Sequence, residues 1–417
     1  MKGQVPDLRG EASLSGLLSD APGARRQFLA RYLPELSYAL SLSGDWTADL
    51  SASPNLWLSR TSTSRDDGAA PSGEDVELHR AWLRVSTPRF EARAGLQRIS
   101  FGSASVLRPL MWFDRLDPRD PLQLTEGVWA VLGRAYLPGN ATVWAWAVRG
   151  EDDRRGWEPI PGARGRLEGG GRVQVPLGPG EVAASYHHRR LDLEGLGLFA
   201  PGTPGPGGRE DRLGLDGKWD VELGVWVEAE MVRQDSEALR VRWLRGITVG
   251  ADYTFKVGNG LTVLGEHMVK ETPSFLPLTL APAPGGGAFF FPSPAARSGA
   301  ALSRSLAPGG APPLPPGDSG EGSGVPTFPT LRLTAFTAGY PLGVLDRVGL
   351  AVYRDWEGEG WFRLLEWRRT YDSWRVHLLG FWNPDVGGLF PSDAPGGAGS
   401  SGSLAGKGAQ LIVVFNH

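Results

Sequence analysis

The chain has 417 residues, 41% of them hydrophobic, and a formal net charge of −3; it contains 16 Trp, 59 Gly, 34 Pro and no Cys. The balanced charge argues against nucleic-acid binding, which usually needs a basic excess. The absence of Cys excludes disulfides, thiolate zinc sites and iron–sulfur clusters, and no apolar run approaches the ~20 residues of a membrane helix. We therefore expect no nucleic-acid partner and no cofactor.

The start of the chain, residues 1–16, has one Lys and no apolar h-region of the kind that a signal peptide contains. We expect a mature, exported chain from which a signal peptide has been removed. Strand patterns are predicted near 9–17, 29–42, 46–60 and 76–86.

Alternation with a period of two residues dominates the chain, and helical spacing is almost absent. Residues 221–231 give the clearest case; their apolar face comprises Val221, Leu223, Val225, Val227, Ala229 and Met231. Residues 47–59 and 247–255 alternate in the same way. The high Trp content predicts aromatic girdles at a membrane interface. An all-β glycan-binding protein is the alternative.

Short turns alternate with long connections. The short turns are expected at 43–45, 87–89, 138–140, 178–181, Asp220, 258–260, 341–346 and 371–373. The long connections are expected at 62–75, 100–126, 149–170, 192–210, 272–329 and 384–407. This rhythm predicts one all-β domain over 1–417, an antiparallel transmembrane β-barrel of about 18 strands with short periplasmic turns and long outer loops. The count falls to 16 if residues 9–26 lie inside or below the barrel.

The connection within 97–127, the third outer connection when the one after the first strand is counted, is irregular, with three prolines and two Asp-Pro steps. We expect residues 100–126 to fold into the barrel and narrow it. An apolar run would dock this loop on the wall: Leu110, Met111, Trp112 and Phe113. Its charged side chains would meet the solute: Arg108, Asp114, Arg115, Asp117, Arg119 and Asp120.

Residues 96–124 resemble a segment of porin-like barrels, alginate-export-type channels among them. In that family an Arg-rich strand end with an aromatic-Gly step leads into a Pro/Asp loop. The matching positions are Gln97, Arg98, Phe101, Gly102, Asp114, Asp117, Pro118, Arg119, Asp120 and Pro121. The resemblance implies an outer-membrane channel without naming a solute. The Pro/Gly/Ser-rich connection 272–329 has no counterpart there, and we expect it to be a long outer loop.

The last strand, 408–416, is similar to the C-terminal signal of outer-membrane barrels. That signal usually ends on an aromatic residue, whereas Asn416 and His417 follow Phe415 here.

If the apolar faces meet lipid, two sets of charges point into the lumen. The basic set, on early strands, comprises Arg80, Arg84, Arg93 and Arg134. The acidic set, on a strand near the middle of the chain, comprises Glu222, Glu228 and Glu230. Opposed walls of this kind would create a transverse field that sorts solutes by charge and dipole. The simpler interpretation is that these charges only solvate a water-filled interior.

Signatures of enzymes are scarce: the sequence has no Gly-x-Ser-x-Gly elbow, His-Glu-x-x-His motif, P-loop or dinucleotide fingerprint. His187 and His188 are neighbours that point to opposite faces of a strand, which makes a poor metal chelate. We expect no metal site and no enzymatic activity. A barrel hydrolase would place its base at His267, beside Glu266, or at His377.

Together these features predict a porin of the bacterial outer membrane, surrounded by lipid, through which small polar or charged solutes diffuse passively. A sheath or scaffold for a partner protein or an exported polymer is the alternative, and a barrel hydrolase is a third candidate. The sequence leaves open whether the chain forms a homo-oligomer or binds a periplasmic or extracellular partner.

Overall fold

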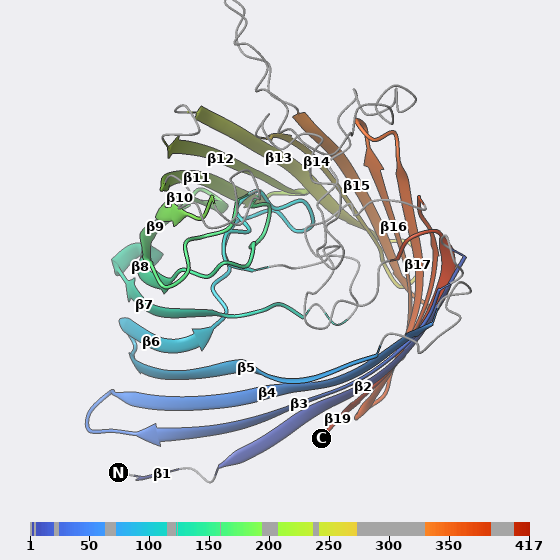
Figure 1. Ribbon diagram of the computed structural model, residues 1–417, viewed down its shortest axis with the longest axis horizontal. Coiled ribbons are helices and arrows are strands. Elements are labelled where there is room, and N and C mark those ends of the chain that lie inside the picture. Colours follow the sequence, from blue (N-terminus) through green and yellow to red (C-terminus); the bar gives the residue numbers. More distant parts are fainter. Residues whose placement is uncertain are drawn as a thin grey trace, which may run out of the picture.

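The computed structural model describes residues 2–3, 6–20, 25–62, 72–114, 122, 124–158, 160–193, 207–236, 242–272, 330–384 and 404–417. Within these ranges the chain is almost entirely β-sheet (Figure 1). Their one helical element is a 3₁₀ turn at Pro138–Asn140. No helix in the described part of the chain is long and apolar enough to cross a membrane.

Eighteen antiparallel strands, β2 to β19, close into one barrel. The ring is closed by β19 and β2, which pair from Gly408↔Ser19 to Asn416↔Glu11, and a short strand β1 (Lys2–Gly3) pairs with the end of β3. The strands of the barrel are β2 (Asp7–Ser19), β3 (Arg25–Ser41), β4 (Thr47–Ser62), β5 (Ser72–Thr87), β6 (Phe90–Gln97), β7 (Val128–Tyr136), β8 (Thr142–Arg149), β9 (Leu167–Leu177), β10 (Gly180–Leu191), β11 (Gly208–Asp220), β12 (Gly224–Ser236), β13 (Arg242–Phe255), β14 (Leu261–Glu271), β15 (Thr330–Pro341), β16 (Asp346–Asp355), β17 (Trp361–Thr370), β18 (Trp374–Trp382) and β19 (Lys407–Asn416). The predicted count of 18 is confirmed, since β2 is a strand of the wall.

The two ends of the barrel differ in their connections. One end, the turn end, carries the short connections, at 42–46, 88–89, 137–141, 178–179, 221–223, 256–260, 342–345 and 371–373. The other, the loop end, carries the long ones, such as 98–127, 150–166 and 383–406. The predicted asymmetry is confirmed; in outer-membrane barrels the turn end faces the periplasm.

The outward face of the wall is apolar, as the exposed side chains of Leu50, Val131, Leu215, Val249 and Leu365 illustrate. Exposed aromatic side chains gather at two levels. Those near the turn end include Tyr38, Phe90, Tyr136, Tyr253, Tyr371 and Trp374. Those near the loop end include Trp129, Trp243, Trp356, Trp361 and Trp382. An apolar band between two aromatic belts is the surface of a barrel that spans an outer membrane.

On the side of β14 to β19 and β2, the inward face carries a buried apolar cluster. Its side chains include Leu17, Met268, Leu331, Leu333, Tyr353, Leu379, Phe381, Ile412 and Val414. The same arrangement accounts for the segment 361–371, in which neither alternating face is cleanly apolar in the sequence. Phe362 and Leu364 are buried inside, whereas Trp361 and Leu365 are exposed outside. Near the loop end, both faces of β17 therefore carry large apolar side chains.

Candidate functional site

Residues 98–114, which we call the inner loop, lie inside the barrel (Figure 1). Trp112 and Phe113 are buried in one cluster with inward side chains of β7 and β8. The rings of Phe101 and Trp146 stack with 5.5 Å between their centroids, and Phe113 meets Trp146 edge-on at 5.5 Å. One apolar surface of the inner loop is thus buried against the β7–β8 wall.

The inner loop also reaches the opposite wall. Leu107 and Met111 belong to the apolar cluster of β14 to β19, together with Met268 and Phe381. The predicted docking run is buried along its whole length: Leu110, Met111, Trp112 and Phe113. Because its two surfaces pack on different sides of the barrel, the inner loop crosses the interior.

Glu228 on β12 is completely buried and holds the two ends of one turn of the inner loop. Its carboxylate accepts hydrogen bonds from the backbone N–H groups of Ala104 (2.9 Å) and Leu110 (2.5 Å). Gly102 has a φ of 101°, and a Cβ there would lie 2.4 Å from Glu228 Oε2. The close approach of this carboxylate to the backbone therefore requires glycine at position 102.

Glu266 on β14 holds the next part of the inner loop. Its carboxylate accepts three backbone N–H groups at 2.5 to 3.0 Å, from Ser105, Val106 and Leu107. It also accepts the indole N–H of Trp226 at 2.9 Å. Three successive N–H groups directed at one oxygen pair form an anion-binding nest, and here the anion is a side chain of the protein itself.

Two further carboxylates complete this set. Asp216 on β11 accepts the hydroxyl of Ser103 at 2.9 Å. Glu230 on β12 accepts the indole N–H of Trp112 at 2.8 Å and pairs with the ammonium group of Lys270. We call these residues the anchor carboxylates: Asp216, Glu228, Glu230 and Glu266.

Charged side chains of the inner loop pair with one another. The carboxylate of Asp114 is buried and lies 3.5 Å from Arg108 and 3.7 Å from Arg98. Arg80 on β5 donates a hydrogen bond to the backbone carbonyl of Thr125 at 2.6 Å, where the connection returns to the wall.

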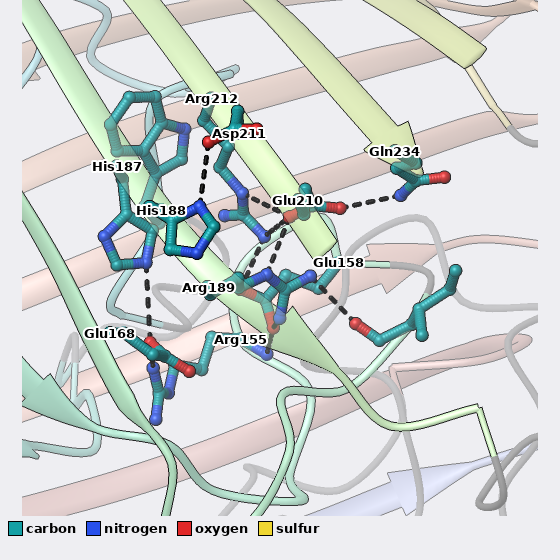
Figure 2. Close-up of polar contacts among 12 residues, drawn as sticks. Arg155, Glu158, Glu168, His187, His188, Arg189, Glu210, Asp211, Arg212 and Gln234 are labelled. Atoms are coloured by element: carbon teal, nitrogen blue, oxygen red, sulfur yellow. Dashed lines mark hydrogen bonds and ion pairs between the residues drawn. The ribbon is translucent and has the colours of Figure 1, made fainter. Parts of the chain in front are cut away.

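The connection between β8 and β9 also enters the barrel, and buried ion pairs hold it there (Figure 2). Arg155 pairs with Glu168 on β9 at 2.9 Å. Glu158 pairs with Arg189 on β10 at 2.9 Å and with Arg212 on β11 at 2.8 Å. Burial of these charges is tolerated because each has a partner of the opposite sign.

Glu210 on β11 completes the network. It accepts hydrogen bonds from Arg189 at 2.6 Å and from the amide of Gln234 at 2.7 Å (Figure 2). The buried guanidinium and carboxylate groups balance in charge: Arg155, Arg189 and Arg212 with Glu158, Glu168 and Glu210. In the connection itself, burial raises the pKa of the Glu151 carboxyl, which lies 3.9 Å from Arg155.

The two inward segments contact each other. The Trp157 indole N–H donates to the Arg108 carbonyl at 3.0 Å, and the Gly156 N–H donates to the Asp114 carbonyl at 3.0 Å. Gly156 has a φ of 47°, and a Cβ there would lie 1.7 Å from the Met111 carbonyl oxygen. The inner loop and the β8–β9 connection therefore form one packed unit inside the barrel.

A cluster of arginines lies on the inward face of β5 to β7, nearer the turn end. Arg84 donates to Asp49 at 2.9 Å, and Glu91 lies 3.2 Å from Arg93 and 3.6 Å from Arg134. Three guanidinium groups thus face two carboxylates, which leaves a local charge of +1 (3 − 2). We call this group of five residues the arginine cluster.

Tryptophan rings support the arginine cluster. The guanidinium carbon of Arg93 lies 4.6 Å from the ring centroid of Trp82, and that of Arg134 lies 4.0 Å from Trp144. The side chains of Arg93 and Arg134 are 18% and 19% exposed. These cations are therefore oriented by the wall and remain accessible to water.

The other predicted residues divide into three groups. Glu228 and Glu230 lie on β12 as expected, but they bind the inner loop and the residues around it. Glu222 lies in the exposed turn between β11 and β12, so its placement on a strand facing the lumen is wrong. The remaining charged positions fall outside the described residues: Arg115, Asp117, Arg119 and Asp120.

Sequence reasoning missed Glu266 as an anchor and Asp49 and Glu91 as the two acids within the arginine cluster. An available signal was strand parity, since Glu266 shares the inward face of β14 with Met268 and Lys270. Among the described residues no group of three or more His, Asp or Glu could hold a metal ion.

No protein-family model and no curated protein matches the chain. Solved structures do. OccK7 (OpdD) of Pseudomonas aeruginosa is 12% identical over 99% of each chain, with a TM-score of 0.54. OccK5 (OpdH) of the same organism is 11% identical over 99% of this chain and 97% of its own, with a TM-score of 0.53. OccAB4 of Acinetobacter baumannii is 9% identical over 100% of this chain and 99% of its own, with a TM-score of 0.53. The likeness is one of fold, a porin-type outer-membrane barrel.

Proposed function

We propose that this chain, a porin-type outer-membrane β-barrel by fold, is a passive channel for small polar or charged solutes. The inner loop and the β8–β9 connection set the width of the pore. The arginine cluster, on the wall nearer the turn end, sets its charge preference. The observation that carries the proposal is a closed barrel crossed by an anchored loop, with partly exposed and oriented arginines on the remaining wall.

The exposed charges favour anions. The anchor carboxylates are occupied by N–H groups of the inner loop and by neighbouring side chains, so they present little negative charge to a solute. The arginine cluster retains a positive excess that water can reach. Oriented charges in a narrow, low-dielectric passage act on ions more strongly than charges in bulk water.

The test is the conductance of the purified barrel in planar bilayers under a salt gradient. The variant R84Q/R93Q/R134Q changes the local charge from +1 to −2 (0 − 2), so we expect its reversal potential to shift toward cation selectivity. Arg369 lies on the outward face of β17, and R369Q serves as the matched control. An unchanged reversal potential in the triple variant would remove the arginine cluster from the pathway.

Silent bilayers would contradict the channel itself and favour the sheath or scaffold alternative. Charge reversal at Arg119 or Asp120 extends the same measurement to the part of the connection predicted from sequence to meet the solute. If either reversal leaves conductance and ion preference unchanged, that position does not lie at the constriction.

A further inference from the structure

The outward face of the barrel carries many arginines near the loop end. Strand parity places them on the same face as exposed apolar side chains such as Phe28, Val131, Met231 and Phe336. They are Arg26, Arg60, Arg149, Arg190, Arg209, Arg233, Arg245, Arg332, Arg354 and Arg363. We call this set the outer arginine belt.

The outer arginine belt lies at the level of the aromatic belt near the loop end. Register places Arg233 directly opposite Trp243, and Arg363 directly opposite Trp382. The guanidinium of Arg354 lies 5.1 Å from the Trp361 ring centroid. Exposed Trp side chains mark the interface between the hydrocarbon and the headgroups. The arginines therefore lie at headgroup height.

Acidic side chains on this face neutralise only part of the belt. Within the described strands they are Glu74, Asp211, Asp235 and Glu271. Arg209 and Arg233 lie 3.5 and 3.8 Å from Asp235, and Arg332 lies 3.5 Å from Glu357 in the connection between β16 and β17. A positive excess remains over the outward strand positions.

The turn end shows no such excess. Near that end of the described strands β2 to β19, the outward charges are Asp346 and Arg369, which pair with each other at 3.6 Å. The asymmetry excludes a general tendency of this barrel to carry arginine at both interfaces. It points to a leaflet-specific, anionic partner at the loop end.

We infer that the outer arginine belt binds phosphorylated glycolipid of the outer leaflet. Guanidinium groups match phosphate oxygens in bidentate geometry, and the Trp rings and apolar strands below them would contact the acyl chains. A free anion would use only the arginines, whereas a lipid uses both parts of the surface. On β16 and β17, Arg354 and Arg363 flank the Trp361 ring, and Arg332 lies on the neighbouring strand β15.

The test uses the full-length chain in detergent micelles, with diphosphoryl lipid A as the probe and native mass spectrometry as the readout. Each arginine near an anionic lipid surface contributes roughly 1 kcal/mol, so we expect R332Q/R354Q/R363Q to weaken lipid A binding by about 10- to 100-fold. R369Q lies on the same strand as Arg363 and at the other interface, and it should bind lipid A as the parent does.

Three results would overturn the inference: equal lipid A binding by the triple variant and the parent, equal binding of phosphatidylglycerol and lipid A, or suppression of lipid A binding by millimolar inorganic phosphate. Electrophoretic migration without heating controls for folding of the barrel. Conductance in bilayers free of lipid A should be the same for the triple variant and the parent. The outcome is therefore independent of the proposed channel function.

Discussion

Single carboxylates on the inner wall decide where the inner loop lies. An irregular segment inside a barrel lacks ladder partners for its backbone N–H groups, and these groups must be satisfied when they are buried. Glu228 and Glu266 supply acceptors for five of them, from residues 104–107 and 110. Hydrogen bonds to a charged group contribute about 1.5–3 kcal/mol each, so two side chains can fix the whole loop.

Glu266→Leu should release the inner loop. It leaves the N–H groups of Ser105, Val106 and Leu107 without their acceptor, at a cost of about 1–3 kcal/mol for each group that stays buried. We expect a larger single-channel conductance with an unchanged migration of the unheated barrel. Glu266→Gln keeps one acceptor oxygen, and its conductance should lie between those of the parent and Glu266→Leu. Parent-like conductance in Glu266→Leu would show that the loop does not limit flow.

Gly102→Ala should have a similar effect for a different reason. The added Cβ would lie 2.4 Å from the Glu228 carboxylate, at a φ of 101° that alanine rarely adopts. We expect the anchored position of the inner loop to be destabilised by about 1–3 kcal/mol and the conductance to rise. Gly133→Ala on β7, where a Cβ meets nothing within 4 Å, is the matched control. Equal conductance of both variants would disprove the requirement for glycine at 102.

The β8–β9 connection is an element held by charge more than by apolar packing. Its Arg155 and Glu158 are buried and reach three successive strands, β9, β10 and β11. Loss of one partner leaves an uncompensated buried charge, which costs far more than the loss of a complete pair. The ion network therefore fixes the connection in one position against the wall.

A double-mutant cycle on Arg155 and Glu168 tests this view. Arg155→Met should lower the free energy of unfolding by about 3–5 kcal/mol, because Glu168 loses its guanidinium partner. The double variant R155M/E168Q should be more stable than the sum of the two single losses implies. Chemical denaturation followed by Trp fluorescence measures all four proteins, and additive losses would argue against direct coupling.

The molecule as a whole has an interior of two kinds. The β14–β19 side is packed with apolar side chains, whereas the arginine cluster and the ion networks lie along β4 to β12. Near the loop end, strands of the apolar side carry large apolar side chains on both faces, one toward lipid and one toward the inner loop. Under the proposed channel function, water and solutes would pass along the charged side of the lumen.

Two phenylalanines distinguish the packed interior from the lipid-facing surface. Phe381 is completely buried inside the barrel, and Phe336 is 43% exposed on the outward face. Phe381→Ala should lower the free energy of unfolding by about 3–5 kcal/mol, as in a well-packed core. Phe336→Ala should lower the free energy of unfolding by clearly less, because lipid or detergent fills the space that the ring leaves. Urea unfolding in micelles compares the two, and equal losses would contradict a packed interior.

Much of the fold was predictable from local pattern. Alternation identified the strands, and the spacing of Gly/Pro turns identified the two ends and the strand number. The apolar run Leu110–Phe113 also indicated a loop that packs against the inside of the barrel. The placement of Glu222 failed because alternation continues through the 221–223 turn, where the chain leaves the sheet.

The sequence by itself determined a membrane barrel, because side-chain alternation and turn chemistry act over a few residues. Only the tertiary structure decided which charges meet. Glu266 lies about 160 positions from the loop that it holds, and its role depends on the register of β14 and on closure of the barrel. The same dependence separates the anchor carboxylates from the partly exposed arginine cluster. In the sequence both sets look alike, because each consists of charges at inward positions of strands with alternating side chains.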